Sequence, residues 1–294
     1  MPGQKYNKRV EDVANYIKSK VPADFSPQLI LMTGSGLGFL AESVDTVVAK
    51  IPYSEIPNFL TLGVVGHKGE LVCGTVSGVP VAVFSGRKHF YEFGENYTDT
   101  QALREIVLPI CVGKKLGAQT YFATNAVGSL DPDYNVGDIS LIKTHIGLFF
   151  PNVLRGDLAE DAVRFLPTND IYDKELRNLF IESANSLGQA EAVKESTYVA
   201  VTGPSYESIG DVVALRSLGA DTVGMSVVPE VLMAGSLGMR CVAASLVTNV
   251  VNQDGQNITS HTEVTAVCKS DIVEKRVLDC ISKFCEMYKT SYTS

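Results

Sequence analysis

Residues 34–38 read Gly-Ser-Gly-Leu-Gly and directly follow an apolar run at 29–33. A strand that ends in glycines lets backbone N–H groups point outward, and Ser35 adds a hydroxyl donor. Such donors can bind an anion, most often a phosphate group. The run lacks the Lys-Ser/Thr pair of a Walker A loop, and Phe39 stands where the dinucleotide-binding pattern needs its last glycine. The pattern therefore indicates either another kind of anion site or a plain strand-to-helix turn.

Polar or small residues also follow five other apolar runs that we predict to be strands. One of them is followed by Arg87, a two-pronged donor for an oxyanion, by His89, a second donor, and by Tyr91, a phenol. The other four are followed by 125–129, 203–207, 224–230 and 248–249. Ligands of open α/β sheets bind at the carboxyl ends of the strands, so we expect these groups to meet in one site.

The elements that must position these groups alternate along the chain. Strands are predicted at 29–33, 70–76, 80–86, 120–125, 138–143, 195–202, 222–226 and 240–247, and residues 77–79 read as a hairpin turn. Helical spacing of apolar residues covers 10–21, 103–110, 172–180, 212–215 and 264–284. Pro109 predicts a kink or a late start in the second of these helices. No repeat, charge block or linker divides the chain, so we predict an α/β fold in which residues 1–294 form a single domain around a central mixed sheet.

Composition narrows the class of protein further. The chain has 294 residues, is 45% hydrophobic and carries a net charge of −8, which argues against nucleic acid or an anionic membrane surface as partner. Neither a signal-peptide core nor an apolar run of about 18 residues is present, so we expect a cytoplasmic protein. The six cysteines form no C-x-x-C pair and read as reduced core thiols, not as metal ligands.

Seven motifs in order, spread over about 29–263, resemble the low-molecular-mass, trimeric purine nucleoside phosphorylases. They are Gly34-Ser-Gly-Leu-Gly38, Gly66-His67, Arg87-x-His89-x-Tyr91-Glu92, Thr124-Asn-Ala126, Gly203-Pro-x-Tyr-Glu207, Gly224-Met-Ser-x-Val-Pro-Glu230 and Thr248-Asn249. The resemblance implies the nucleoside phosphorylase fold, with a partly barrel-like sheet flanked by helices, and a homotrimer. It also implies reversible phosphorolysis of 6-oxopurine ribonucleosides and deoxyribonucleosides, such as inosine and guanosine, in purine salvage. Inorganic phosphate is then a co-substrate, and neither a cofactor nor a metal is needed.

The resemblance also implies roles for individual residues. Phosphate would be bound by Ser35, His67, Arg87, His89, the backbone at Ala126, and Ser226. The nucleoside would be bound by Tyr91, Met225 and His261 at the ribose hydroxyls and by Tyr198, Tyr206 and Val223 along the sugar and base. Glu207 would accept from the purine N1–H and Asn249 would bond O6 and N7, which makes these two, with His89, the implied catalytic residues.

Other polar residues near these motifs receive a structural interpretation. Glu92 and Glu230 read as carboxylates at helix starts, and His145 as a structural histidine. Lys88, next to Arg87, reads as solvated.

Two segments depart from the family pattern. The family sends a phenylalanine from the 146–166 loop into the neighbouring subunit's ribose site. Phe165 aligns with a later phenylalanine, which leaves Phe149 and Phe150 as other candidates. Val250 stands where mammalian relatives carry Lys, and 250–256 reads as a gate over the base, so broader base acceptance is expected.

Two alternative functions remain open at this stage. A methylthioadenosine phosphorylase would have Asp at Asn249 and a small apolar residue at His261, and both positions argue against it. A non-catalytic purine-binding homologue would have lost Arg87, His89 or Ser226, and all three are present.

Overall fold

The computed structural model describes residues 2–63, 68–157, 159–251 and 260–292. Its described strands form one mixed sheet in the order β2-β3-β4-β1-β5-β8-β7-β6-β9. Their bounds are β1 (Leu29–Thr33), β2 (Thr46–Pro52), β3 (Glu70–Val76), β4 (Val79–Ser85), β5 (Thr120–Ser129), β6 (Ile139–Ile146), β7 (Val193–Ala200), β8 (Thr222–Gly224) and β9 (Arg240–Val250).

Part of the sheet closes on itself. Besides β8, strand β5 also pairs with β9, in parallel, so β5, β8, β7, β6 and β9 form a ring. The remaining strands extend from β5 as an open sheet, with β1 parallel to both β4 and β5. The predicted central mixed sheet with a partly barrel-like region is therefore confirmed. Because β1, β4, β5 and β9 run parallel, their carboxyl ends meet at one edge.

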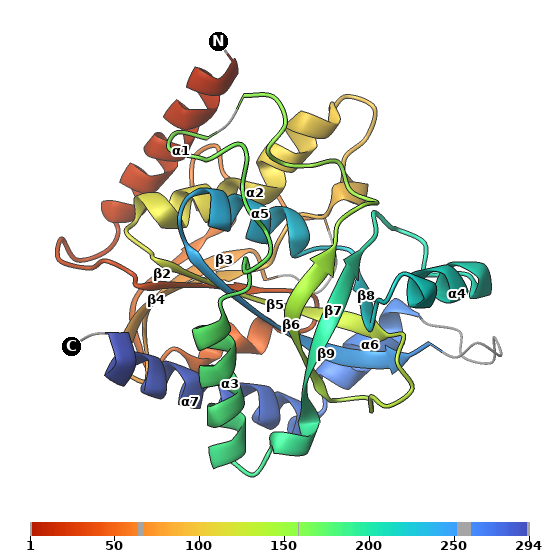
Figure 1. Cartoon of the computed structure of the whole chain (residues 1–294). Helices are drawn as coiled ribbons and strands as arrows, with labels where there is room; N and C mark the ends of the chain where they lie inside the picture. The colour runs from red at the N-terminus through yellow and green to blue at the C-terminus, as the bar shows by residue number, and fades with distance from the viewer. Residues whose placement is uncertain (1, 64–67, 158, 252–259, 293–294) are drawn as a thin grey trace.

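Helices cover both faces of the sheet (Figure 1). Their bounds are α1 (Pro2–Lys18), α2 (Asp99–Lys115), α3 (Lys174–Ser186), α4 (Ile209–Ser217), α5 (Val228–Ser236), α6 (His261–Cys268) and α7 (Asp271–Tyr292). Helices α1, α2 and α5 pack on one face, while α3 and α7 pack on the other. Each interface is a large apolar cluster, so the sheet is buried on both sides and holds its strand ends rigidly.

The predicted strands match the observed ones, with two corrections. Strand β2 was not predicted, because its side chains are mostly exposed and its sequence shows no apolar alternation. Strand β5 continues to Ser129, beyond the predicted strand end at 125, because its second half pairs with β9 across a register shift between Val127 and Gly128. The residues between β3 and β4 do form a hairpin turn.

Helix α2 also differs from its prediction. It begins at Asp99, where Thr98 caps it by accepting from the Gln101 amide, so of the two alternatives predicted from Pro109, a kink or a late start, the late start is wrong. Pro109 lies buried inside the helix.

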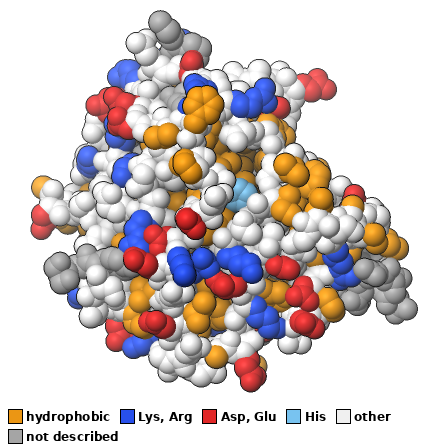
Figure 2. All heavy atoms as spheres, viewed as in Figure 1, with side chains coloured by type: hydrophobic (Ala, Val, Ile, Leu, Met, Phe, Trp, Pro, Cys, Tyr) orange, Lys and Arg blue, Asp and Glu red, His pale blue; other side chains and the backbone are white. Residues whose placement is uncertain are grey.

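The surface carries charged side chains of both signs. On the face drawn in Figure 2, basic and acidic side chains are interspersed among the described residues. Within the described ranges, no helix is long and apolar enough to cross a membrane. All six cysteine side chains are buried and none is in a disulfide, as the sequence predicted.

Candidate active site

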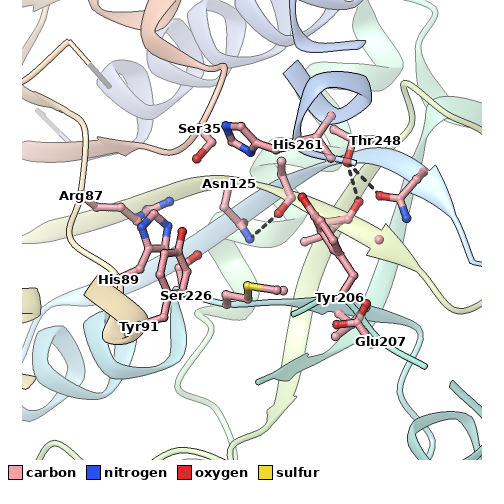
Figure 3. A pocket seen from close by; sticks show the side chains of 18 residues that line it. Ser35, Arg87, His89, Tyr91, Asn125, Tyr206, Glu207, Ser226, Thr248 and His261 are labelled. Carbon is pink, nitrogen blue, oxygen red and sulfur yellow. Dashed lines mark hydrogen bonds between the residues drawn. The ribbon is translucent and has the colours of Figure 1, made fainter. Parts of the chain in front are cut away.

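A cavity of about 100 Å³ lies at the carboxyl ends of β1, β4, β5 and β9 (Figure 3). It is lined by Ser35, Arg87, His89, Tyr91, Asn125, Ala126, Val127, Gly128, Tyr206, Glu207, Val223, Gly224, Met225, Ser226, Thr248, Asn249, His261 and Val264. The cavity thus brings together every predicted site residue except His67, which lies outside the described residues, and Tyr198. Figure 3 shows Arg87, His89 and Ser226 at one end and Tyr206 and Glu207 at the other.

The glycine-rich turn after β1 depends on close approach. A Cβ atom on Gly34 would lie 2.7 Å from Arg87 Nη1, so only glycine lets the arginine pass behind the turn. Gly36 has φ of +76°, and a Cβ there would lie 2.5 Å from the Cβ of Cys268. The Cys268 thiol in turn donates to the Ser35 carbonyl at 3.8 Å, so helix α6 supports the turn from behind.

Arg87 is the cationic group of the cavity wall. Its side chain is only 1% exposed, its Nε donates to Glu230 Oε1 at 2.9 Å, and its Nη1 donates to the Thr124 carbonyl at 2.7 Å. The Tyr121 hydroxyl donates to Glu230 Oε2 at 2.8 Å. Burial lowers the pKa of Arg87, but Glu230 and Tyr121 raise it by more, so the guanidinium stays charged. Glu230 lies in the first turn of α5, as predicted for a helix-start carboxylate, and it also holds the Arg87 guanidinium.

His89 is held by Glu92. The backbone amide of His89 donates to Glu92 Oε1 at 2.7 Å, its Nδ1 lies 3.3 Å from the same oxygen, and its ring stacks on Tyr91. Burial raises the pKa of Glu92, but these hydrogen bonds and Lys88 outweigh it and hold the value at about 2. The prediction that Lys88 is solvated is wrong, because its ammonium lies 3.4 Å from Glu92 and over the Phe93 ring.

Ser226 is presented by a strained turn between β8 and α5. Val227 has φ of +66° and ψ of −52°, and the Val228 amide donates to the Ser226 carbonyl at 2.8 Å, which makes a γ-turn. A β-branched residue seldom adopts this conformation, so the surrounding contacts must enforce it.

Tyr198 supplies such a contact. We predicted that it lines the sugar and base, but its side chain is 0% exposed and lies behind the cavity wall. Its hydroxyl donates to the Ser226 carbonyl at 3.1 Å and lies 3.3 Å from the Ser226 amide. A Cβ on Gly224 would lie 2.7 Å from that hydroxyl, which explains the glycine.

The other end of the cavity combines a carboxylate with an amide. Burial raises the pKa of Glu207, and the nearby Asp211 charge adds to the shift. Asn249 Oδ1 accepts from Thr248 Oγ1 at 3.2 Å, which turns the amide oxygen toward that hydroxyl. This end therefore offers a carboxylate acceptor and an amide, a pairing suited to a planar ring with a donor and an acceptor on one edge.

His261 and Tyr91 also line the cavity, and the Tyr91 ring lies beside His89 (Figure 3). His261 is the first residue of α6, whose N-cap Ser260 accepts from the Glu263 amide and fixes the start of the helix. Burial raises the pKa of Tyr91 to about 12, so its phenol stays protonated and can donate. Both residues thus add groups that can form hydrogen bonds to the lining of the cavity.

Some lining residues had no individual role in the sequence analysis, although all except Val264 lie in segments that were predicted to meet at the site. They are Asn125, Val127, Gly128, Gly224, Thr248 and Val264. Most of them lie beside predicted residues within the same motifs, and this proximity is the sequence signal that could have identified them. Asn125 also fixes β5 against β9, since its Oδ1 accepts from Ser245 Oγ at 2.6 Å.

The three candidate phenylalanines of the 146–166 loop lie in different environments. Phe150 packs inward against the Phe90 ring. Phe149 lines a second hollow beside Tyr206 and Glu207. Phe165 is 90% exposed. His145, just before this loop, is half-buried. This partial burial lowers its pKa to about 4, and its Nδ1 lies 3.0 Å from the Tyr172 hydroxyl, in line with a structural histidine.

The described residues offer no candidate metal site. Over the described residues, no group of three or more His, Cys, Asp or Glu side chains is arranged to hold a metal ion.

Comparison with known proteins adds to this geometry. Residues 28–283 match the family model of the phosphorylase superfamily. The chain is 38% identical over 260 residues to purine nucleoside phosphorylase 1 of Bacillus subtilis, covering 88% of this chain and 92% of the relative. Identity to the Bos taurus purine nucleoside phosphorylase is 37% over 260 residues, covering 86% of each chain. The structure of a Schistosoma purine nucleoside phosphorylase in complex with hypoxanthine superposes with a TM-score of 0.85 at 34% identity, covering 95% of this chain and 96% of that one. The chain therefore belongs to the phosphorylase superfamily and, within it, to the purine nucleoside phosphorylases.

Proposed function

We propose that this purine nucleoside phosphorylase acts on 6-oxopurine nucleosides, inosine and guanosine first, and releases the free base and the sugar 1-phosphate for purine salvage. The observation that carries the proposal is the polarity of the cavity. Donors and a buried cation lie at one end and Glu207 lies at the other, while Asn249 lines the cavity beside Thr248. That arrangement fits a phosphate and a purine on opposite sides of a sugar.

The reaction follows from this polarity. Phosphate, held by Ser35, Arg87, His89 and Ser226, attacks the anomeric carbon from the face opposite the base. The C1′–N9 bond breaks, and its electron pair moves onto the purine ring. Donation from Asn249 to N7 stabilises the negative charge that builds on the leaving base, while Glu207 accepts from N1–H and so orients the ring. Since phosphate is the nucleophile, the proposal needs neither a metal nor an organic cofactor.

We also propose that the chain acts as a cytoplasmic homotrimer. The 146–166 loop supports this, because it exposes two large apolar side chains that a neighbouring subunit could cover, Leu148 at 79% and Phe165 at 90%. Light scattering of the purified protein should give three times the chain mass. A fully active monomer at assay concentrations would contradict the trimer.

Inosine turnover tests the phosphorolysis proposal. With phosphate, the absorbance change of inosine cleavage should appear, and in rigorously phosphate-free buffer it should vanish. Undiminished cleavage without phosphate would show a hydrolase instead.

Substitution of one phosphate donor tests the site. Ser226→Ala should raise the KM for phosphate by roughly 10- to 150-fold, the equivalent of about 1.5–3 kcal/mol for a hydrogen bond to a charged group. Ser217→Ala, at an exposed serine of α4, is the matched control and should change nothing.

A further inference from the structure

Glu230 lies directly behind the anion end of the cavity and does not line it. It is 0% exposed, and its two carboxylate oxygens are divided between Arg87 and Tyr121, at 2.9 and 2.8 Å. The guanidinium that faces the cavity is therefore paired with a buried carboxylate on its other side. A buried ion pair of this kind stabilises little by itself, but loss of one partner leaves an uncompensated charge.

Helix α5, which carries Glu230, begins shortly after Ser226 and positions it. Only the strained Val227 turn separates Ser226 from α5, and Glu230 lies in the first turn of that helix. Ser226 and the carboxylate that holds Arg87 thus belong to one short segment, which the Tyr198 hydroxyl fixes through the Ser226 backbone. A serine and an arginine from distant parts of the chain are positioned by one structural unit.

We propose that Glu230 is a positioning residue that sets the strength of phosphate binding through Arg87. Its bond to Nε fixes the guanidinium in the cavity wall, and its charge compensates the cation while the site is empty. Phosphate and Glu230 then share one cation, so phosphate is held less tightly than an unshared arginine would hold it. This inference rests on the proposed function, because it takes phosphate as the anion.

The variant Glu230→Gln isolates the charge. Its side-chain oxygen can still accept from Arg87 Nε, and its amide can donate to the Tyr121 oxygen, so both contacts remain possible without the negative charge. We expect the KM for phosphate to fall by roughly tenfold, at the low end of coupling for close, desolvated charges, while the KM for inosine stays unchanged. Phosphate should also raise the melting temperature of this variant by more than it raises that of the unmutated protein.

Two further variants separate charge from position. Glu230→Asp keeps the charge but shortens the side chain by one methylene, so its bond to Arg87 Nε no longer fixes the guanidinium in the cavity wall. The KM for phosphate should therefore rise instead of falling. Tyr121→Phe removes one hydrogen bond and no charge, so it should leave the KM for phosphate within about twofold of its original value. A carboxylate that is merely structural would lower the melting temperature or kcat in these variants and leave both KM values unchanged.

The outcomes distinguish this inference from the proposed function. An unchanged or raised KM for phosphate in Glu230→Gln overturns the inference even if inosine is cleaved normally. If no nucleoside is cleaved, the proposed function fails, and the phosphate-dependent rise in melting temperature still decides the inference. Should Glu230→Gln fold only when phosphate is present, compensation of Arg87 by phosphate is supported. Failure to fold even with phosphate overturns it.

Discussion

Glu207 should decide which purines the cavity accepts, and Glu207→Gln tests this directly. An ionised carboxylate can only accept hydrogen bonds, so it suits the N1–H of a 6-oxopurine and faces the lone pair of adenine N1. Glutamine keeps the shape of the side chain and can either accept or donate. The substitution therefore weakens one pairing and permits the other at a single position.

The size of the effect follows from the hydrogen bonds exchanged. Replacing a charged acceptor by a neutral one should cost inosine about 1–1.5 kcal/mol, and a new bond to N1 should favour adenosine by about 0.5–1.5 kcal/mol. Together these terms reduce the preference for inosine over adenosine, as the ratio of kcat/KM values, by roughly 10- to 150-fold. The partial burial of Glu207 is what keeps water from cancelling the difference.

The assay measures kcat/KM for both nucleosides at saturating phosphate, with Glu182→Gln, the same change at an exposed position of α3, as control. Since burial raises the pKa of Glu207, its accepting form is lost as the pH falls, and it is lost at a higher pH than for a free carboxyl group. The preference for inosine should therefore decline on acidification in the unmutated protein and stay flat in Glu207→Gln. An unchanged preference in the variant would refute the assignment of Glu207.

Three other outcomes are expected. Gly34→Ala places a methyl group 2.7 Å from Arg87 Nη1, so it should weaken phosphate binding in kinetic assays and lower the melting temperature. Val227→Gly should leave the free energy of unfolding within about 1–2 kcal/mol of its original value, because the strain relieved offsets the buried side chain lost, while kcat should fall as Ser226 loosens. Glu92→Gln should lower the free energy of unfolding at neutral pH but not at pH 2, because the pKa of about 2 means that the stabilisation by Glu92 is present above about pH 4.5 and lost as the pH falls. Denaturant titrations at several pH values check it, and the same pH dependence in the variant as in the unmutated protein would contradict the role of Glu92 in holding His89.

The anion end of the site was largely predictable because its groups follow strand ends. The glycines follow one buried strand, and Arg87 and His89 follow another. Their proximity could be predicted from the rule that the carboxyl ends of parallel strands meet at one edge of the sheet. What holds Arg87 was not predictable, since Glu230 is 143 positions away along the chain. Contacts over such a separation depend on the sheet order, which periodicity does not reveal.

The errors in the sequence analysis have physical causes. The family resemblance assigned Tyr198 to the wall, yet its side chain is fully buried behind the wall, because a resemblance in sequence does not show which face of a strand each side chain occupies. Residues 125–129 contain Asn and Gly and resemble a turn, but pairing with β9 keeps them extended. Strand β2 escaped prediction because an exposed edge strand carries little apolar pattern.

The two ends of the cavity differ in how closely they are tied to the buried core, so substitutions at the two ends should differ in their effect on stability. At the anion end, Arg87 and Ser226 are tied into the buried interior through Glu230 and Tyr198, so changes there affect both binding and folding. At the base end, Glu207 lies in a partly exposed segment between β7 and α4, where few core contacts constrain it. Substitutions at the base end should therefore alter base choice at little expense of stability, while phosphate recognition stays coupled to the fold.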